Sequence, residues 1–433
     1  MRKKVTYTVV DISRFKDALL HWAKQYEEVV WLDSNNHAGA YSSFDAIIAV
    51  DALTAKITDA QNAFNDLQEY QKETNDWLFG YLSYDLKNDV EHLSSQNFDG
   101  LHFPDLYFFQ PKKIITILKN TVEFIYLQMV DDEIEIDFQT LAKDIVHTPQ
   151  ERISINPVKI RMRIFKDEYF KNVQLMLQHI YRGDIYEANF CQEFYAENIE
   201  IDPLRAYNKL NKISKAPFAT YLRLGNKYLL SASPERYLKK KENKVISQPI
   251  KGTAKRSANS IEDKMLRSEL FADDKERSEN IMIVDLVRND LSKSALKGSV
   301  KVEELCKIYT FKQVHQMIST ITSIIAINKN PIDVIKETFP MGSMTGAPKV
   351  SAMKIIEKLE SFKRGLYSGA VGYFLPNGDF DFNVVIRSIL YNEKEKYVSY
   401  AVGSAITAKS IPELEYEECL LKAKAMREVL ENT

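Results

Sequence analysis

The spacing of hydrophobic residues predicts helices and strands along the whole chain. Phe15, Leu19 and Trp22 recur at helical spacing within residues 11–25, and the apolar run 29–32 that follows is typical of a buried strand. Tyr, Phe and Ile gather in several later segments, which favours strands there. We therefore expect a helix over 54–71 and strands over 77–84, 106–109 and 113–118.

The stretch 131–157 is more charged and less periodic than its surroundings. It predicts a boundary between an N-terminal region, residues 1–155, and a C-terminal region, residues 156–433. Early in the second region, apolar residues three or four positions apart share one face of a predicted helix. Gly183 stands just past its end, where a glycine commonly terminates a helix.

Antiparallel strands dominate the prediction for the rest of the second region. The turn Gly225-Asn226 joins two apolar runs, 218–224 and 227–232, in the pattern of a hairpin. Mostly antiparallel strands with helices between them indicate an α+β fold rather than a doubly wound parallel sheet. The last part of the chain predicts a three-stranded antiparallel meander over 367–374, 379–391 and 397–402.

The composition is that of an ordinary globular protein. Of 433 residues, 45% are apolar, and 58 Lys and Arg nearly balance 60 Asp and Glu, for a formal net charge of −2. Disordered, collagen-like and disulfide-scaffold proteins are therefore excluded. This charge gives no field that would attract nucleic acid or an anionic membrane, and the three lysines at 239–241 are interpreted as a solvated turn.

The sequence also bears on the compartment. The N-terminus is not followed by an apolar signal segment, and the longest apolar stretch, 318–327, is interrupted by Ser and Thr. The three cysteines are far apart and form no C-x-x-C pair, so neither a disulfide framework nor a zinc site is indicated. We expect a cytoplasmic protein with no membrane and no nucleic-acid partner.

Two pairs of glutamates stand out because each has helical spacing. Glu276 and Glu279 are three residues apart on one predicted helix, and Glu415 and Glu418 are three apart on another. The members of each pair therefore share a helix face. Either pair alone is what a solvated helix face shows. If both face one cleft, four carboxylates without a thiolate or imidazole cluster suit a hard cation such as Mg²⁺.

Two loops are further candidates for binding or catalysis. Residues 339–349 carry Gly342 and Gly346 before a predicted helix, whose free amides could hold an anion; a tight loop entering a helix is the alternative. In residues 248–255, Lys251 lies between an apolar strand position and a Gly-Thr turn. Partial burial would lower the pKa of this lysine and free an amine nucleophile, although most lysines are simply solvated.

Three single residues complete the candidates. Glu235 ends a predicted strand and could present its carboxyl group to the same cleft as Lys251. Arg387, inside an apolar segment, is costly to bury unless it meets a carboxylate. His315 is more often a core histidine with satisfied hydrogen bonds than a catalyst. From the residues alone, these features support an Mg²⁺-dependent enzyme that acts on a carboxylated small molecule.

Six motifs between Arg161 and the C-terminus identify a family. They are Gly183-Asp-Ile-Tyr-Glu-Ala-Asn189, Ser233-Pro-Glu-Arg236, Pro249-Ile-Lys-Gly-Thr253, Asp285-Leu-Val-Arg-Asn-Asp290, Gly342-Ser-Met-Thr-Gly-Ala-Pro-Lys349 and Glu415-Tyr-Glu-Glu418. In this order they resemble the chorismate-utilising enzymes, which include anthranilate synthase component I, aminodeoxychorismate synthase component I, and isochorismate and salicylate synthases. The resemblance implies an α+β fold in which two orthogonal, mostly antiparallel β-sheets are surrounded by helices.

The resemblance also implies a role for each candidate. Glu279 and Glu418 would contact Mg²⁺, with Glu276 and Glu415 in support, and the metal would bind the ring carboxylate of chorismate. Glu235 would be the general acid that protonates the departing C4 hydroxyl, which requires a raised pKa. Chorismate would further be held by Gly252, Thr253, Ser343, Tyr367, Arg387 and Gly403, and His315 would lie beside its ring.

Lys251 is the residue that separates the branches of the family. Anthranilate, isochorismate and salicylate synthases typically have Ala at this position. Aminodeoxychorismate synthases often have Lys, whose amine is thought to attack C2 of chorismate before ammonia attacks C4. The resemblance therefore implies synthesis of 4-amino-4-deoxychorismate for folate and p-aminobenzoate, with anthranilate synthase component I, in tryptophan synthesis, as the alternative.

Glu187 departs from the patterns of these branches. Isochorismate and salicylate synthases have a general-base Lys at this position, so water addition is disfavoured here. Many aminating relatives have Gln, and the role of Glu187 is left open.

The source of ammonia and one possible ligand follow from the same resemblance. The chain shows no Gly-x-Cys-x-Gly elbow, so ammonia is expected from a separate glutamine amidotransferase subunit, component II. It also shows no lyase extension, so release of p-aminobenzoate would need another enzyme. Trp31-Leu-Asp-Ser-Asn35 falls where some relatives bind tryptophan. Asp33 replaces the usual residue, and a plain core strand is the alternative interpretation.

Overall fold

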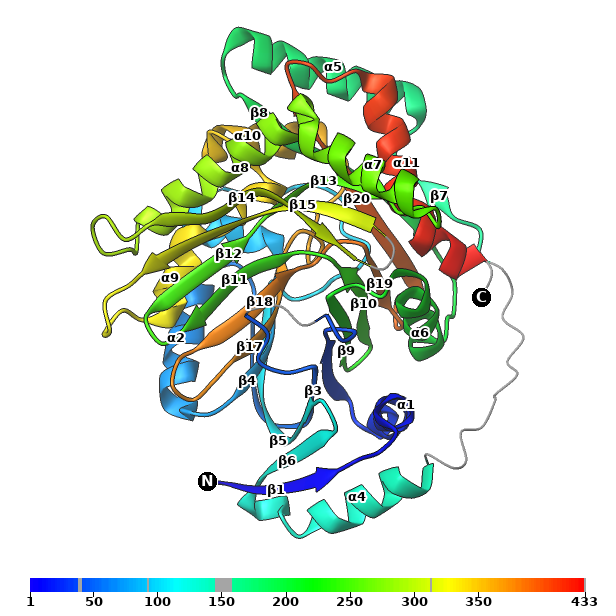
Figure 1. The fold of residues 1–433 in the computed structure, drawn as a ribbon, viewed down its shortest axis with the longest axis vertical. Coiled ribbons are helices and arrows are strands. Elements are labelled where there is room, and N and C mark those ends of the chain that lie inside the picture. Colours follow the sequence, from blue (N-terminus) through cyan, green and yellow to red (C-terminus); the bar gives the residue numbers. More distant parts are fainter. Residues whose placement is uncertain (38–40, 92, 145–157, 312–313, 432–433) are drawn as a thin grey trace.

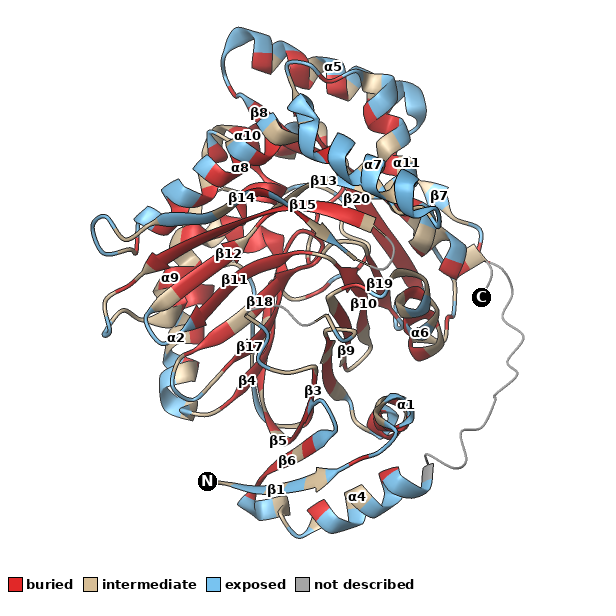
Figure 2. Ribbon diagram, viewed as in Figure 1, coloured by how far each residue is buried: buried red, intermediate tan, exposed pale blue. Residues whose placement is uncertain are grey.

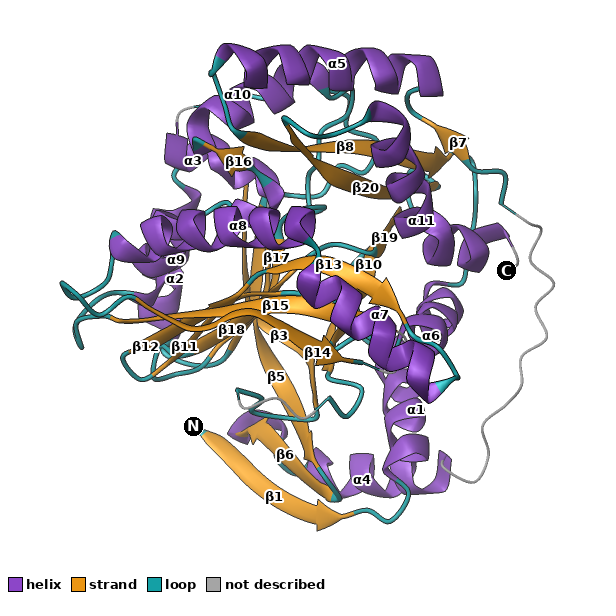
Figure 3. Ribbon diagram, turned by 45° about the horizontal axis from the view of Figure 1, so that its top comes forward, coloured by secondary structure: helices purple, strands orange, loops and turns teal. Residues whose placement is uncertain are grey.

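The structure is a computed structural model that describes residues 1–37, 41–91, 93–144, 158–311 and 314–431 (Figure 1). Its named strands form one hydrogen-bonded network, and every ladder between them is antiparallel. Helices surround this network (Figure 3). The α+β class predicted from the sequence is therefore confirmed.

The elements have the following bounds. The strands are β1 (Arg2–Thr8), β2 (Glu28–Asp33), β3 (Ala46–Thr58), β4 (Leu78–Leu82), β5 (Leu106–Leu118), β6 (Thr121–Leu127), β7 (Arg161–Met162), β8 (Glu187–Ala196), β9 (Phe218–Leu224), β10 (Lys227–Ser233), β11 (Arg236–Lys241), β12 (Lys244–Gln248), β13 (Ile250–Lys255), β14 (Lys301–Thr310), β15 (Val314–Ile324), β16 (Gly346–Ala347), β17 (Ala370–Phe374), β18 (Phe380–Val384), β19 (Ser388–Asn392) and β20 (Tyr397–Thr407). The helices are α1 (Ile12–Trp22), α2 (Ala63–Thr74), α3 (Lys87–Glu91), α4 (Glu133–Asp144), α5 (Lys166–Arg182), α6 (Pro203–Ser214), α7 (Ser260–Ala272), α8 (Asp274–Ser292), α9 (Pro331–Thr338), α10 (Lys349–Leu359) and α11 (Pro412–Glu431), and η4 (Gly342–Met344) is a 3₁₀ turn.

The strands make two layers. The first runs β8, β20, β19, β10, β9, β2 and β3. The second runs β4, β17, β18, β11, β12 and β15, with β13 and β14 also paired to β15. Strand β5 joins the layers, because it pairs with β3 along most of its length and with β4 near its beginning. Strands from the N-terminal and C-terminal parts of the chain therefore share each layer.

Three large apolar clusters and one small one, under α7, fill the spaces that this arrangement creates among the described residues. The cluster between the layers includes Phe79 and Tyr373 of the second layer and Leu229 of the first. A second cluster lies between the first layer and helices such as α5 and α11, and a third lies between the second layer and α2, α8 and α9. Most strands are accordingly buried, with β1 and β14 more exposed, and the outer faces of the helices are exposed (Figure 2). Each large side chain buried in this way contributes about 1.5–3 kcal/mol to folding.

The predictions of local structure are confirmed where the hydrophobic spacing is regular or a turn signal is clear. Helix α5 ends at Gly183, whose φ of 87° is left-handed, and the hairpin of β9 and β10 has the predicted turn. The helix predicted over 54–71 is wrong in its first part: residues up to Thr58 belong to β3, and the helix begins only at Ala63. The strands predicted over 106–109 and 113–118 are one strand, β5, which continues through Pro111.

Pro111 is tolerated in β5 because the ladder is irregular at that point. It lies opposite Ala52, and the register of β3 shifts between Ala52 and Thr54. A proline has no N–H to donate to a ladder, so it is accommodated at such a bulge. The segment 131–157, predicted as a boundary, contains α4 up to Asp144. The boundary placed after residue 155 lies outside the described residues.

The predicted three-stranded meander is also wrong. Residues 379–391 form two strands: β18 pairs with β17 and β11 in the second layer, and β19 pairs with β10 and β20 in the first. The chain passes from one layer to the other at residues 385–387, and Arg387 has a left-handed φ of 52° there. This crossing places Arg387 where the two layers meet.

The lysine run that the sequence suggested to be a solvated turn is instead part of strand β11. Lys239 and Lys240 are buried, and their ammonium groups lie 3.0 Å from carboxylate oxygens of Asp381 and Asp379. The long lysine stems pack in the sheet while the charges are paired. Within the part of the chain that the structure describes, no helix combines the length and the apolar character needed to cross a membrane.

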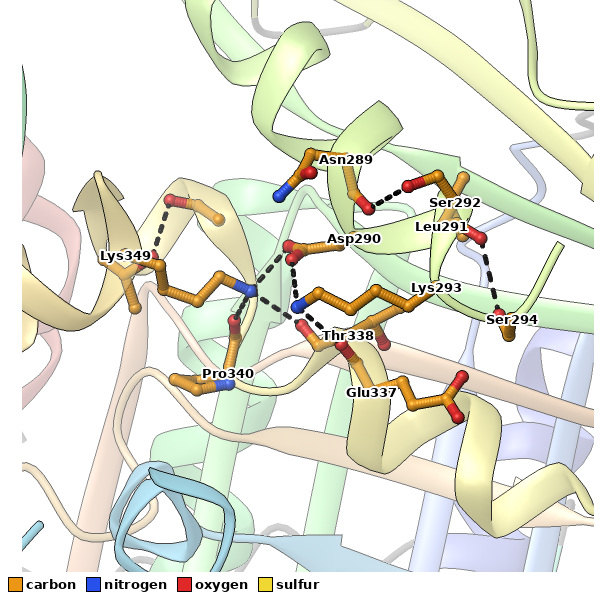
Figure 4. Close-up of polar contacts among 12 residues, drawn as sticks. Asn289, Asp290, Leu291, Ser292, Lys293, Ser294, Glu337, Thr338, Pro340 and Lys349 are labelled. Carbon is orange, nitrogen blue, oxygen red and sulfur yellow. Dashed lines mark hydrogen bonds and ion pairs between the residues drawn. The ribbon is translucent and has the colours of Figure 1, made fainter. Parts of the chain in front are cut away.

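A buried ion pair fixes the glycine-rich loop against α8 (Figure 4). Lys349 Nζ donates to Asp290 Oδ2 at 2.5 Å and to the backbone oxygens of Thr338 and Pro340 at 3.0 and 2.8 Å. Lys293 Nζ donates to the other oxygen of Asp290 at 3.1 Å. The three acceptors around Lys349 hold the start of α10 to the end of α8, to the end of α9 and to Pro340 just before η4. The loop is therefore positioned by the side chain of Lys349.

Lys349→Met should destabilise the protein by about 3–5 kcal/mol, because it leaves one oxygen of the buried Asp290 carboxylate and two backbone oxygens without their donor. Lys293→Ala is the matched control: this lysine contacts the same carboxylate from a half-exposed position and should cost about 0–1 kcal/mol. The free energy of unfolding is measured from urea titrations of both variants. Equal losses would contradict a structural role for Lys349.

Candidate active site

The two glutamate pairs come together at one site. Glu276 and Glu279 lie near the start of α8, and Glu415 and Glu418 lie near the start of α11. Lys275 joins the two helices, with its Nζ 3.3 Å from Glu415 Oε1 and 3.9 Å from Glu279 Oε1. The carboxylates of both helices therefore share one electrostatic environment.

Burial and neighbouring charges shift the pKa values in this group. Burial raises the pKa of Glu279 to about 7, with Glu276 adding to the shift and Lys251 opposing it. Burial, and then the charge of Glu418, raise the pKa of Glu276. For Glu418 burial acts in the same direction, but Lys422, 2.5 Å away, outweighs it and lowers the pKa. A bound cation would relieve this repulsion.

The donor set suits a magnesium ion that is completed by substrate and water. Among the described residues, no group of three or more acidic, imidazole or thiol side chains is arranged as a complete metal site. Mg²⁺ usually takes only one or two protein carboxylates and fills its octahedron with water and substrate oxygens. Glu279 Oε1 is buried and accepts no hydrogen bond from the described residues. The residues present therefore fit Mg²⁺, with Glu279 as the side chain that most needs a cation.

Lys251 lies beside this acidic group, on β13. Its Nζ is 3.3 Å from Glu187 Oε1 of β8, and its side chain is only 14% exposed. Asn280 of α8 donates to the backbone oxygens of Lys251 and Met317, which holds β13 and β15 against the helix. The main chain at Lys251 is therefore fixed from the same helix that carries Glu276 and Glu279.

The expectation that burial frees the amine of Lys251 is wrong for the chain by itself. Burial does lower the pKa of Lys251, but the charges of Glu187, Glu279 and Glu418 outweigh burial and raise the pKa above its ordinary value. The prediction from the sequence included the effect of desolvation on this pKa. It could not include the neighbouring carboxylates, because they come from distant parts of the chain. Lys251 is therefore an ammonium ion until a nearby group accepts its proton.

Glu235 has the pKa shift that a general acid needs. It follows β10, and its buried carboxyl group has a pKa raised to about 7 by burial, against the opposing effects of Ser343 and Lys251. Ser343 of η4 lines the same cavity, and its hydroxyl lies near enough to Glu235 to lower the pKa of that carboxyl group by hydrogen bonding. A carboxyl group and a hydroxyl thus face one small space.

Tyr367 and Gly403 contact Cys191, and Arg387 lies within electrostatic reach of Tyr367. Tyr367 Oη lies 3.6 Å from Cys191 Sγ, and Gly403 is paired with Cys191 across β20 and β8. A Cβ atom at Gly403 would lie 2.5 Å from that sulfur, so the close approach requires glycine. The guanidinium of Arg387 forms no hydrogen bond or ion pair with the described residues, and burial lowers its pKa. A buried, unpaired guanidinium favours an anionic ligand.

The remaining candidates differ in their surroundings. Gly252 has a φ of 91°, and a Cβ there would lie 3.2 Å from Glu276 Oε2, so the acidic group reaches the backbone of β13. Thr253 follows on the same strand. His315 is not brought into hydrogen-bond contact with the other candidates. Its Nδ1 lies 3.0 Å from Thr310 Oγ1 and its Nε2 lies 3.1 Å from Asp263 Oδ1, so both ring nitrogens already have partners.

Sequence reasoning missed two cations that organise the site. Lys275 gave no distinctive signal in the sequence, because its spacing from Glu279 is that of an ordinary surface ion pair on a helix. Arg364 is buried and binds Glu360, and it also donates to the backbone oxygens of Met344 and Asn189. It thereby ties η4, which carries Ser343, to β8. The spacing of Glu360 and Arg364 was the only local signal.

The segment 31–35, for which tryptophan binding and a plain core strand are the two alternatives, lies in and just after the buried strand β2. Trp31 is buried in β2 and donates to Tyr207 Oη at 3.1 Å, while Asp33 accepts from Lys16 at 2.8 Å. A pocket lies beside this strand, with Asp33, Ser34 and residues of β3 and β9 in its lining. Tryptophan binding stays a prediction.

Comparison with known proteins assigns the family. The family described as chorismate binding enzyme matches residues 25–428. The chain belongs to this family. Several of the motifs that suggested this family supply residues of the site above.

Sequence similarity does not decide between the aminodeoxychorismate synthase and the anthranilate synthase branches of the family, as two relatives show. The probable chloroplastic aminodeoxychorismate synthase of Oryza sativa subsp. japonica is 34% identical over 88% of this chain and 46% of its own length. This chain thus spans about half of the rice protein. Anthranilate synthase component 1 of Thermus thermophilus is also 34% identical, over 82% of this chain and 77% of its own length.

A solved structure shows the same fold. Anthranilate synthase component I from Streptococcus pneumoniae superposes with a TM-score of 0.77 at 24% identity, over 90% of this chain and 94% of that one. This likeness supports the architecture of two packed β-layers inside a helical shell. It does not distinguish between the reactions of the family.

Chorismate turnover should fall as pH rises through about 7 if Glu235 must donate a proton. Its pKa is raised by burial, so the acid form persists to about pH 7 and declines above it. The pH profile of kcat in Glu235→Gln should lose this alkaline limb together with most of the activity. Glu269→Gln, on the exposed face of α7, should keep the limb. An unchanged profile in Glu235→Gln would contradict the assignment.

Proposed function

We propose that this chain is component I of an aminodeoxychorismate synthase, which converts chorismate and ammonia to 4-amino-4-deoxychorismate. The observation that carries the proposal is Lys251, placed between Glu187 and the acidic group of α8 and α11. The lysine side chain is only 14% exposed, so it is not an ordinary solvated side chain. Its position in the motif is the one that separates aminodeoxychorismate synthases from their relatives.

In this proposal each residue of the site has its own role in the reaction. The amine of Lys251 attacks C2 of chorismate while Glu235 protonates the departing C4 hydroxyl, which leaves as water. Ammonia then attacks C4, and Lys251 leaves C2. Arg387 and Tyr367 hold the enolpyruvyl carboxylate, because the unpaired guanidinium needs an anion. The ring lies against Gly252, Thr253 and Ser343.

Mg²⁺ completes the proposed site and would neutralise the ring carboxylate, which the surrounding glutamates would otherwise repel. Glu279 and Glu418 hold the metal, and Glu276 and Glu415 support it.

Glu279→Gln should weaken Mg²⁺ binding at least tenfold, about 1.4 kcal/mol, because it removes the charge of a carboxylate whose buried Oε1 accepts no hydrogen bond from the described residues. Calorimetric titration with MgCl₂ measures the affinity without any turnover. Glu417→Gln, on the exposed side of α11, is the control and should bind Mg²⁺ as the unmodified chain does. Equal affinity in all three proteins would remove Glu279 from the metal site.

Ammonia for this reaction is proposed to come from a separate glutamine amidotransferase subunit, and the product is proposed to serve folate synthesis. The test is whether added ammonium salt replaces glutamine plus that subunit in an assay of the purified chain. The cytoplasmic location stays a prediction from the sequence.

Anthranilate synthase component I remains the second candidate, because the Thermus thermophilus enzyme is as similar as the rice protein. The two functions differ in their products. Anthranilate synthase releases pyruvate and a fluorescent aromatic compound, whereas aminodeoxychorismate synthase retains the enolpyruvyl group until a lyase removes it.

Product analysis of the purified chain with chorismate, Mg²⁺ and an ammonium salt tests the proposal. We expect 4-amino-4-deoxychorismate by liquid chromatography with mass detection, and p-aminobenzoate only after a lyase is added. Lys251→Ala should reduce this product by at least a hundredfold, since it removes the nucleophile. Anthranilate with pyruvate, and no need for a lyase, would instead assign the chain to the second candidate.

A further inference from the structure

Glu187 is a buried carboxylate that the roles above do not use. It begins β8 and is 2% exposed. One oxygen, Oε1, lies 3.3 Å from Lys251 Nζ, while the other, Oε2, is buried and has no hydrogen-bond partner among the described residues. An unpartnered oxygen on a buried carboxylate is costly unless it has a task or a ligand.

The backbone holds this carboxylate in place from two sides. Residue 187 is paired with Ala347 of β16 and with Thr407 of β20. A Cβ atom at Gly346 would lie 2.1 Å from the backbone oxygen of Glu187, so the strands are in close contact. The start of β8 cannot move away without breaking both ladders, so the distance from Glu187 to Lys251 is set by the sheet.

The other charged groups near Lys251 have other proposed roles in the site. Glu279 of α8 and Glu418 of α11 act on it electrostatically, but neither is within ion-pair distance, and both are proposed to hold Mg²⁺. Glu276 and Lys275 belong to the same acidic group and its counter-ion. Glu235 must keep its own proton for the leaving hydroxyl. Glu187 is therefore the carboxylate left to accept a proton from Lys251.

We propose that Glu187 is the base that deprotonates the ammonium group of Lys251 before it attacks chorismate. This proposal rests on the proposed function, because it requires the lysine adduct. The need for a base follows from the site itself: the ammonium is surrounded by carboxylates that keep it protonated, and a protonated amine has no electron pair to donate. Oε1 is already at hydrogen-bond distance from the proton.

The step balances in protons and electrons. One proton passes from Lys251 Nζ to Glu187, the freed electron pair forms the Nζ–C2 bond, the two ring double bonds each shift by one position, and the C4–O bond breaks. The oxygen leaves as water with the proton of Glu235. When ammonia attacks C4, the double bonds return, the Nζ–C2 bond breaks, and Lys251 recovers its proton from Glu187. The new C4 ammonium returns a proton to Glu235.

A purely structural counter-ion would behave in the opposite way. If Glu187 only stabilised the charge of Lys251, removing its negative charge would release more free amine and speed up adduct formation. If Glu187 is the base, removing it slows this step, because the proton must then go to solvent. The two roles therefore predict rate changes of opposite sign for the same substitution.

The test is the rate of adduct formation in single-turnover experiments with chorismate and Mg²⁺, ammonia being left out, followed by intact-protein mass spectrometry. Glu187→Gln should slow adduct formation by about 10²–10⁴-fold at neutral pH, the usual contribution of a general base, and its rate should recover as pH is raised. Glu187→Asp should retain much more activity than Glu187→Gln. Glu197→Gln, just beyond β8 at an exposed position, should react as the unmodified chain does.

Each outcome has a separate meaning. Adduct formation in Glu187→Gln that is as fast as, or faster than, that of the unmodified chain at every pH overturns the role of Glu187. Product without any adduct in the unmodified chain overturns the lysine mechanism of the proposed function instead. If Glu187→Gln does not fold, Glu187→Ala with added formate provides the second reading: saturable rescue by this small base supports the role, and no rescue in a folded Glu187→Ala protein contradicts it.

Discussion

The largely enclosed ammonium of Lys251 and the carboxylates around it form the interaction on which the site depends. Glu187 lies 3.3 Å from Lys251, and the charges of Glu279 and Glu418 also act on it. Without this cation, carboxylates from β8, α8 and α11 would face each other in a poorly solvated space, which is strongly unfavourable. The same arrangement explains why the lysine stays protonated and why the group as a whole favours a further cation.

The fold holds these groups in position through contacts far apart in the sequence. The chain crosses between the two β-layers at residues 385–387, which places Arg387 at their junction. The loop that carries Ser343 is tied to α8 by the ion pair of Lys349 and Asp290, and to β8 by Arg364. Two buried cations thus fix the loop in advance, so that substrate binding need not order it.

Local patterns in the sequence predicted local structure well. The uninterrupted apolar period of α5, the two-residue turn between β9 and β10, and the helical spacing of each glutamate pair depend only on nearby residues. The α+β class followed from these elements, and the motifs identified the family. The prediction failed where the structure of a segment depends on the strand that pairs with it. Pro111 is accepted within β5 because of a bulge in β3. Residues 379–391 form two strands in different layers because each pairs with a different neighbour.

The same limit applies to the site. The sequence selected Lys251, Glu235 and the glutamates as candidates, but it gave the wrong direction for the pKa of Lys251. That value depends on three carboxylates from three elements, none of which is near Lys251 in the chain. Lys239 and Lys240 were misjudged for the same reason, since their partners Asp381 and Asp379 lie on or just before another strand, β18. Charge pairing across a sheet has no local signature.

Amination without aromatisation is the chemistry that this arrangement is proposed to favour, and its central claim is a covalent bond between Lys251 and the substrate ring. Peptide mapping by mass spectrometry tests this claim most directly, after the chain is incubated with chorismate and Mg²⁺ in the absence of ammonia. The expected result is a mass increase of chorismate less one water on the peptide that carries Lys251, which disappears when an ammonium salt is added. Full product formation with Lys251 unmodified throughout would contradict it.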